Sequence, residues 1–488
     1  MRKQKKLIAI LAVIVCVLVG VYFAVVMPII NREDPPETTV PIETTDGEEI
    51  GAADRILMFG QVTREHIERI EVHNAEGEFT FYRTDGGFKI EGHEDVSVDA
   101  ELFASFITSC GYTLSLSRID EPEPFSEYGL DDTPIWYKLT TTDGEVHTVY
   151  IGDETVARNG YYARYEGRDA VYILDATIAD TVMEPVENMV TPLLSYYEYS
   201  FDKKLTYFNF FRDGELYFRL EALSEEEETD LEAMAAYKMT FPTSYVPKEE
   251  CSTIFQGLAG LQGTKTVALG VEEEELARFG LDKPKCQITF GVDDIEHYLV
   301  ISEKTENGTY YVGSGLFDII AEVDAATIAF VEYDLINWVS PYIFRMNIAS
   351  IDTLELTASD FHETFALEGT GDTLTVKTLS NGKNVDVDNF KAFYRDLLII
   401  CIEGDPAFSD EEKKSAASDE NLYLTLTVKT RTGLEREYKF YRYSDRRSFL
   451  EINESGDFYV LHNIVAKIKG DAEKVVSGQS VDYTEKYD

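Results

Sequence analysis

The segment that decides the fold reads Ile135-Trp136-Tyr137-Lys138-Leu139-Thr140, then Asp143-Gly144, then His147-Thr148-Val149-Tyr150-Ile151-Gly152-Asp153. Apolar and polar residues alternate on both sides of the Asp-Gly pair, which is typical of two half-buried strands joined by a tight hairpin. Two further segments with strand character follow at residues 160–164 and 170–174. The sequence therefore predicts a four-stranded antiparallel meander.

This meander recurs twice more along the chain, at residues 287–323 and 422–461. Before each copy the sequence predicts a pair of strands around a turn, at residues 67–82, 205–218 and 351–365. Between the pair and the meander lies an amphipathic helix whose apolar residues are spaced by three and four, as in Leu102-Phe103 and Phe106-Ile107. Asp99 and Asp388 are suited to be N-caps or first-turn acids of two of these helices. A closing helix is expected at residues 176–183, 325–336 and 464–475.

A short motif lies before the meander in two of the copies. Tyr128-Gly129-Leu130-Asp131 recurs as Phe279-Gly280-Leu281-Asp282, and a blurred version occurs at residues 406–410. The glycine permits a left-handed backbone, and the aromatic residue and leucine can plug a core. Gly129 and Gly280 are 151 residues apart in the numbering, a spacing that suits one ordinary small domain per copy.

We therefore expect an α+β fold of three tandem modules of antiparallel β-sheet, each with helices packed on one face. Their predicted bounds are residues 57–196, 197–341 and 342–488, the last module being divergent. The acidic stretches 224–230 and 409–420 are interpreted as surface loops.

The N-terminus predicts how the modules are attached. Leu7 to Ile30 contain no charged side chain and follow the basic start Arg2-Lys3-Gln4-Lys5-Lys6. About 20 apolar residues suffice for a helix to cross a bilayer, and the basic flank indicates a cytoplasmic N-terminus. Residues 1–30 are thus predicted to be a single-pass signal anchor in a bacterial plasma membrane, contacting the bilayer through Leu7–Ile30. The acidic Pro/Thr-rich residues 31–56 are predicted to be a tether.

Two other interpretations of this start fit less well. A cleaved signal peptide would have a shorter apolar core and a small-x-small cleavage site. A lipoprotein would need small residues before Cys16, where Ile14 and Val15 are bulky. The C-terminal bulk is therefore placed outside the cytoplasm.

Composition limits the kinds of partner. The formal net charge is −46, and such a surface disfavours nucleic acid, whose binding requires clustered Lys and Arg. The chain is 44% hydrophobic and 12% aromatic, so it has the material for folded cores. The cysteines outside the N-terminal segment are widely spaced and form no Cys-x-x-Cys, which predicts buried single thiols rather than disulfides or zinc ligands.

The motif at Tyr128–Asp131 and the strands at residues 149–153, 160–164 and 170–174 resemble, in this order and after a membrane anchor, the bacterial domain-of-unknown-function family 4340. The resemblance is good over residues 67–192, weaker over 205–341 and faint over 351–475. Members are often encoded beside gliding-motility-type ABC transporter subunits. The resemblance therefore implies an accessory role in the envelope, with such a transporter as partner, and it carries over no catalytic residue.

The remaining residues give no reaction signature. The seven histidines form no metal-ligand spacing, and His147 and His297, at matching positions of two copies, are expected to face the surface. Residues 260–266 resemble a phosphate loop only superficially, because the lysine does not follow the glycine directly. No catalytic residue, metal site or cofactor is predicted. The candidate interaction or motif residues are Tyr128, Gly129, Leu130, Asp131, Tyr161, Tyr162, Phe279, Gly280, Leu281, Asp282, Tyr310 and Tyr311.

Three functions remain open. The first is a membrane-tethered, non-enzymatic accessory or interaction component of the envelope, associated with an ABC-type transport system. The second is a glycan- or peptide-binding module that uses the paired tyrosines. The third is an envelope hydrolase with the adjacent carboxylates Asp131-Asp132 or Asp153-Glu154, which would also suit a cation. We favour the first, without an expectation for the oligomeric state.

Overall fold

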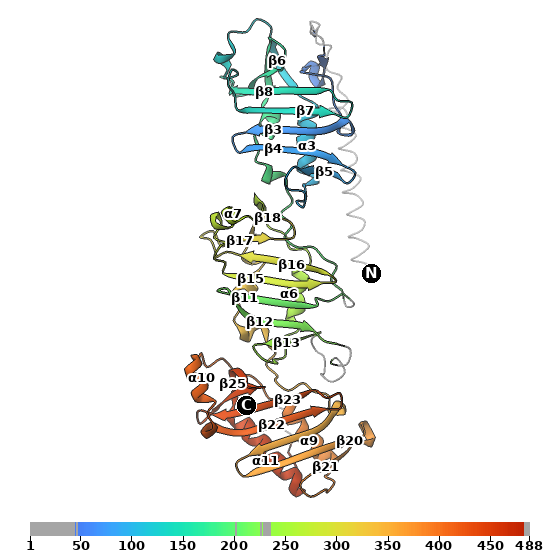
Figure 1. Ribbon diagram of the computed structural model, residues 1–488, viewed down its shortest axis with the longest axis vertical. Helices are drawn as coiled ribbons and strands as arrows, with labels where there is room; N and C mark the ends of the chain where they lie inside the picture. The colour runs from blue at the N-terminus through green and yellow to red at the C-terminus, as the bar shows by residue number, and fades with distance from the viewer. Residues whose placement is uncertain (1–43, 45–46, 201–202, 225–226, 228–235, 483–488) are drawn as a thin grey trace, which may run out of the picture. The chain divides into compact units, whose positions relative to one another are not determined.

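The computed structural model describes residues 44, 47–200, 203–224, 227 and 236–482 (Figure 1). They belong to two compact units, one of residues up to 78 together with 106–183, the other of residues 79–105 together with 184–488. The predicted membrane segment Leu7–Ile30 lies outside the described residues. Within the described ranges, no helix is both long and apolar enough to cross a bilayer.

Three antiparallel sheets follow one another along the chain, as the repeats predict. The first has the order β1-β2-β6-β10-β9-β8-β7-β3-β4-β5. Its strands are β1 Glu49–Ile50, β2 Ile56–Leu57, β3 Ile67–Asn74, β4 Gly77–Thr84, β5 Gly87–Ile90, β6 Leu114–Ile119, β7 Ile135–Thr141, β8 Val146–Glu154, β9 Gly160–Tyr165 and β10 Val171–Asp175.

The second sheet has the order β13-β12-β11-β15-β16-β17-β18-β14, and the third has the order β21-β20-β19-β22-β23-β24-β25. The strands of the second are β11 Tyr207–Arg212, β12 Glu215–Ala222, β13 Tyr237–Phe241, β14 Lys265–Leu269, β15 Cys286–Val292, β16 Ile295–Ile301, β17 Thr309–Ser314 and β18 Ile319–Asp324. Those of the third are β19 Ile351–Ala358, β20 Phe361–Glu368, β21 Thr375–Thr378, β22 Leu422–Thr430, β23 Glu435–Arg442, β24 Arg447–Ile452 and β25 Ser455–Leu461.

The same strand order underlies all three sheets. Three sequential strands, β11 to β13 in the second sheet, lie next to the predicted meander, and the strand before the meander, β14, pairs at its far edge. In the third sheet a single bridge between Gly404 and Tyr459 takes the place of that last strand. The first sheet extends beyond it by β1 and β2, at the end of the segment interpreted as a tether.

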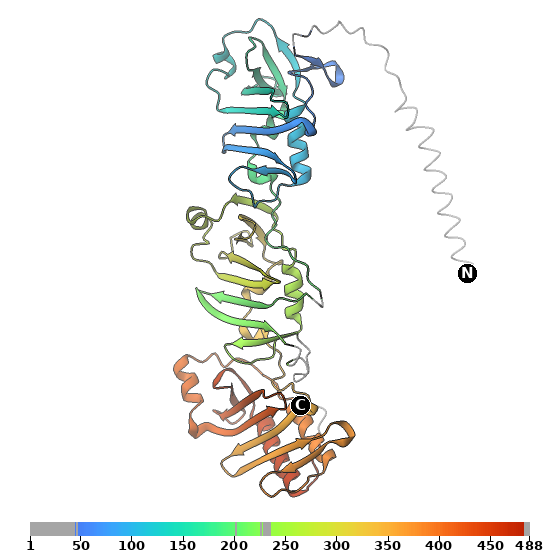
Figure 2. The ribbon, with the colours of Figure 1, turned by 45° about the vertical axis from the view of Figure 1, so that its right-hand side comes forward.

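The helix that precedes each meander packs against one face of its sheet (Figures 1 and 2). These helices are α3 Ala100–Gly111, α6 Glu250–Leu258 and α9 Val387–Leu398. Phe255 of α6 lies 5.0 Å, ring centre to ring centre, from Phe208 of β11, and Phe390 of α9 lies 5.2 Å from Phe365 of β20. Buried aromatic rings therefore form the centre of each core.

The helix caps follow partly from the sequence. Asp99 Oδ1 accepts a hydrogen bond from the backbone N–H of Leu102, which confirms its capping role. In the third module Asp386 is the N-cap and accepts from the Asn389 N–H at 2.8 Å, whereas Asp388 lies in the first turn. Both arrangements satisfy N–H groups that have no partner within the helix.

Short helices also cover the opposite face, which the sequence did not predict. Successive strand residues point to opposite faces. Val300 is on the face opposite to α6. There it packs with Ala268, Leu281 and Ile320 in a second cluster, which α7 Glu273–Arg278 covers. Helix α10 Asp410–Ala416 covers an equivalent cluster in the third sheet, where Phe408 packs against buried Phe449. The interpretation of residues 409–420 as a loop was thus wrong, because Ser409 and Glu412 form a capping box.

The closing helices differ between the modules. Helices α4 Ala176–Met183 and α11 His462–Ser477 confirm the first and third predictions. The expected helix at residues 325–336 is instead a 3₁₀ turn, Ala329–Glu332, and the short helix α8 Leu335–Trp338. Asp334 starts α8 through a capping box with Asn337, so a continuous helix cannot pass this point.

Candidate functional site

The first motif forms a turn that plugs the outer face of the first sheet. Gly129 adopts φ +67° after the 3₁₀ turn Phe125–Tyr128, and Leu130 is fully buried. Gly152 of β8 makes room for this turn, because a Cβ there would lie 2.2 Å from the Tyr128 carbonyl oxygen. The Tyr128 ring packs edge-on against Tyr162, with centroids 4.9 Å apart.

The second motif repeats this arrangement in the second sheet. Gly280 has φ +69° after helix α7, and Leu281 is buried in the outer cluster. Phe279 packs edge-on against Tyr311, again at 4.9 Å. These matching contacts assign a packing role to the aromatic residue, the glycine and the leucine of both motifs.

The other tyrosine of each pair points to the inner face. The Tyr310 hydroxyl donates to Glu332 Oε1 at 2.6 Å, and this bond keeps the pKa of Glu332 below its usual value. Tyr161 is less buried, and its pKa is raised by burial and by the neighbouring carboxylates of Asp180 and Glu154. Asp131 and Asp282, which complete the motifs, are exposed.

The adjacent carboxylates proposed for cation binding or hydrolysis are exposed as well. Asp131, Asp132, Asp153 and Glu154 lie at the surface of the first unit. Among the described residues, no group of three or more His, Cys, Asp or Glu side chains is arranged to hold a metal ion. The interaction role of the candidate residues stays a prediction.

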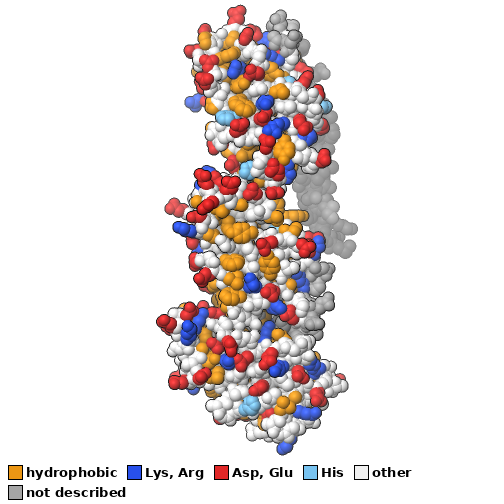
Figure 3. Space-filling view, viewed as in Figure 1, with side chains coloured by type: hydrophobic (Ala, Val, Ile, Leu, Met, Phe, Trp, Pro, Cys, Tyr) orange, Lys and Arg blue, Asp and Glu red, His pale blue; other side chains and the backbone are white. Residues whose placement is uncertain are grey.

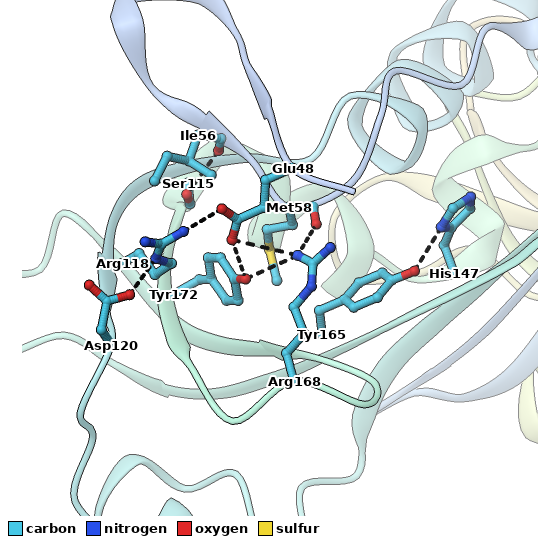
Figure 4. Close-up of polar contacts among 10 residues, drawn as sticks. All are labelled: Glu48, Ile56, Met58, Ser115, Arg118, Asp120, His147, Tyr165, Arg168 and Tyr172. Carbon is cyan, nitrogen blue, oxygen red and sulfur yellow. Dashed lines mark hydrogen bonds and ion pairs between the residues drawn. The ribbon is translucent and has the colours of Figure 1, made fainter. Parts of the chain in front are cut away.

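A buried carboxylate that sequence reasoning missed lies at the end of the predicted tether. The side chain of Glu48 has no exposed surface and accepts hydrogen bonds from Arg118 and from the Tyr172 hydroxyl, the latter at 2.6 Å (Figure 4). Arg168 Nη1 lies 3.6 Å from the same carboxylate and also donates to the Met58 carbonyl oxygen and to Tyr172. We call these four residues, Glu48, Arg118, Arg168 and Tyr172, the carboxylate clamp.

The carboxylate clamp lies beside the short strands β1 and β2 at the edge of the first sheet. Beside it, Ser115 Oγ donates to the Ile56 carbonyl oxygen at 2.8 Å, and the Arg118 Nε donates to Asp120 at 2.6 Å (Figure 4). A hollow of about 630 Å³ opens next to the clamp and is lined partly by Arg118 and Arg168. No local pattern in the sequence predicts the clamp, because Glu48 is 70 residues from Arg118 and 124 residues from Tyr172.

Aromatic side chains also form a row on the outer face of the first sheet. Register places His73, Trp136, Tyr150 and Arg164 side by side on β3, β7, β8 and β9. The His73 and Trp136 rings stack with centroids 5.8 Å apart, and the Arg164 guanidinium lies 4.2 Å from the centre of the Tyr150 ring. All four side chains are half-buried and thus partly open to solvent. We call these residues the aromatic row.

The two equivalent histidines lie on the inner faces, so the expectation that they face the surface was wrong. His297 is 2% exposed and stacks on Phe290 at 4.7 Å. His147 stacks on Phe59 at 4.3 Å, and its Nδ1 lies 2.9 Å from the Tyr165 hydroxyl (Figure 4). Burial lowers the pKa of both imidazoles.

A second buried charge cluster lies between α9 and α11. Lys467 forms ion pairs with Asp396 and Asp471, whose side chains are 0% and 1% exposed, and Lys474 also pairs with Asp471, at 2.8 Å. Burial raises the pKa of Asp396, whereas the lysine partners hold the pKa of Asp471 below its usual value. The cluster joins two helices and is part of the core.

These features define a tandem-repeat α+β protein. A family model described as "Domain of unknown function (DUF4340)" matches residues 89–240 and 239–414, which together cover more than half of the chain. The chain therefore belongs to the DUF4340 family and carries its domain twice in tandem. The comparisons with curated proteins and with solved structures gave no match.

Proposed function

We propose that this protein is a membrane-tethered, extracytoplasmic interaction component of the bacterial envelope. In this proposal Leu7–Ile30 anchor the chain in the plasma membrane, and the modules bind a subunit of an ABC-type transport system without catalysing a reaction. The transporter as partner comes from the family resemblance, and the anchor comes from the N-terminal sequence.

The observation that carries the proposal is the aromatic row. Trp, Tyr and Arg are the residues that contribute most strongly to protein–protein binding. Here Trp136, Tyr150 and Arg164 lie in one line across three strands, with His73 on the fourth, and stacking and cation–π contacts hold the side chains in place. A preordered aromatic surface loses less conformational entropy on binding than a flexible one, so it is suited to dock a partner.

Site-specific photo-crosslinking tests the proposal. The probe is placed at Thr148 on β8, which pairs with Lys138 on β7 next to the aromatic row. There a photoreactive phenylalanine replaces the threonine in the full chain, in its native cells. The expected result is a crosslinked transporter subunit, identified by mass spectrometry, that disappears when Trp136 is changed to Ala. The same probe at Leu379, which is 58% exposed in the third module, serves as the control.

Two outcomes would contradict the proposal. One is that the probe at position 148 captures no envelope protein. The other is that the captured protein is the same at position 379 and is insensitive to Trp136→Ala, because the crosslink would then reflect proximity alone.

A further inference from the structure

The outer face of the second sheet carries a polar hollow that the proposed function does not use. It measures about 470 Å³ and is lined by Thr206, Tyr207, Asn209, Arg219, Glu221, Ala222 and Glu296. The hollow is largely open to solvent, so a ligand would lie against the sheet with one face exposed. In Figure 3 hydrophobic side chains gather between acidic ones over this sheet.

The strand register explains how the hollow is built. One row across the sheet contains Glu221, Tyr207, Gly291 and Glu296, on β12, β11, β15 and β16. The next row contains Arg219, Asn209, Thr289 and Tyr298 on the same strands. The first row thus places the Tyr207 ring between two carboxylates, and the second row adds Arg219 and Asn209 beside it.

Gly291 lets the Tyr207 ring lie on the sheet. A Cβ at Gly291 would lie only 2.7 Å from Tyr207 Cε1 and 3.1 Å from Cδ1, so the ring occupies the space above the glycine. The Tyr207 hydroxyl donates to Glu296 on the next strand but one and so holds the ring in this position. The ring therefore forms a fixed platform that lines the hollow.

Planar polar groups are fixed beside the platform. Arg219 Nε donates to Asn209 Oδ1 at 2.7 Å, and Asn209 Nδ2 donates to Thr289 Oγ1 at 2.9 Å. Asn209 is only 9% exposed, and within the described part of the chain the Arg219 guanidinium makes no other hydrogen bond. At the end of the other row, Glu221 accepts from Thr240 Oγ1 at 3.2 Å.

We infer that this hollow binds an uncharged saccharide. A pyranose ring has an apolar C–H face that can stack on Tyr207, and its hydroxyl groups can donate to Glu221 and Glu296 and accept from Arg219. The two carboxylates outnumber the guanidinium, so an anionic ligand is disfavoured. The strands β11, β12, β15 and β16 are paired within the sheet, so a peptide cannot add here as a further strand.

Saturation-transfer NMR and calorimetry on the full chain in lipid nanodiscs test the inference. The probes are three uncharged tetrasaccharides: cellotetraose, maltotetraose and the β-1,4-linked tetramer of N-acetylglucosamine. At least one is expected to bind, and Tyr207→Ala is expected to weaken its binding about tenfold or more. Tyr207→Phe keeps the ring but loses its hydrogen bond to Glu296, so it should weaken binding by about threefold or less, clearly less than Tyr207→Ala.

Further variants separate ligand contact from folding. Tyr196→Ala removes a tyrosine that is 69% exposed elsewhere in the same unit and should leave binding unchanged. If Tyr207→Ala fails to fold by circular dichroism, Arg219→Lys decides instead, because it keeps the charge but loses the planar donor group and should weaken binding severalfold.

The inference is overturned if none of the three saccharides binds at millimolar concentration. It is also overturned if folded Tyr207→Ala binds as well as the unchanged protein, or if Tyr207→Phe is as weak as Tyr207→Ala. None of these results bears on the crosslinking at the aromatic row, because that experiment uses a different sheet and a protein partner.

Discussion

Replacing Glu48 by Gln tests whether the carboxylate clamp holds strands β1 and β2 in place. The substitution keeps the shape of the side chain but removes its charge. The introduced amide can still meet the Tyr172 hydroxyl, but it no longer forms ion pairs with Arg118 and Arg168. We expect the segment of residues 47–57 to open more often while the rest of the first sheet stays folded.

The size of the effect follows from the burial of the partners. Removing one member of a fully buried ion pair destabilises by about 3–5 kcal/mol. Arg118 and Arg168 keep 10% and 17% of their side-chain surface exposed, and Arg118 retains Asp120 at 2.6 Å. These remaining interactions favour the lower end, about 3 kcal/mol, which increases the population of the open segment roughly 100-fold.

Hydrogen exchange measured by mass spectrometry detects this opening. The reporters are backbone N–H groups in or next to the segment, namely those of Gly51, bonded to the Arg55 carbonyl at 2.8 Å, and Met58, bonded to the Thr113 carbonyl at 3.0 Å. Both should exchange faster in Glu48→Gln. Glu49→Gln is the matched control, because Glu49 is the exposed neighbour and carries the same charge.

Two results would refute the reasoning. If Glu48→Gln and Glu49→Gln exchange alike, the clamp does not hold the segment. If the strands of the meander exchange faster by the same factor, Glu48 stabilises the whole unit rather than its N-terminal edge.

Three further predictions concern stability. Gly280→Ala should cost about 1 kcal/mol in chemical denaturation, because an alanine is strained at φ +69° but its Cβ meets no atom within 4 Å. Gly129→Ala should cost more, because its Cβ would lie 2.6 Å from the Asp153 carboxyl carbon. Equal losses of stability in the two variants would contradict this. Burial lowers the pKa of His297, so the unfolded state binds the proton more readily and stability should fall as pH drops below about 6.5. His297→Phe should reduce this acid sensitivity in thermal melts at pH 5 and 8. An unchanged difference between the two melts would count against this prediction. Lys467→Met should cost about 3–5 kcal/mol of stability, because it leaves the carboxylates of Asp396 and Asp471 without their shared cation. Adding Asp396→Asn should recover part of this loss. Failure of the recovery would show that the lysine acts by packing.

Short-range patterns in the sequence predicted the repeated parts of the fold. The meander strands follow from alternation and Asp-Gly turns, and the burial of Leu130 and Leu281 confirms that the motif leucine plugs a core. Helix α10 could have been found from its capping pair Ser409 and Glu412, but the surrounding acidic residues favoured a solvated loop. His297 was misplaced because the face of a strand depends on its register, which one sequence does not fix.

Contacts between distant residues could not be predicted. The carboxylate clamp depends on Glu48 meeting Arg118 and Tyr172 across the edge of a sheet, and nothing in a Glu of an acidic segment distinguishes it from its neighbours. The Tyr207 platform likewise depends on Gly291, which lies 84 positions along the chain and becomes its neighbour only through the pairing of β11 with β15.

The residue limits of the family matches differ from those of the sheets, and this difference affects how the protein can be divided into fragments. The first match begins at residue 89, inside β5, and ends at residue 240, inside β13, after all of β11 and β12. A fragment excised along these limits would include β11 and β12 but lack β15, their continuation in the second sheet, and would expose the long unpaired edge of β11 to aggregation. The limits of the family match are therefore displaced by about three strands from the limits of the sheets.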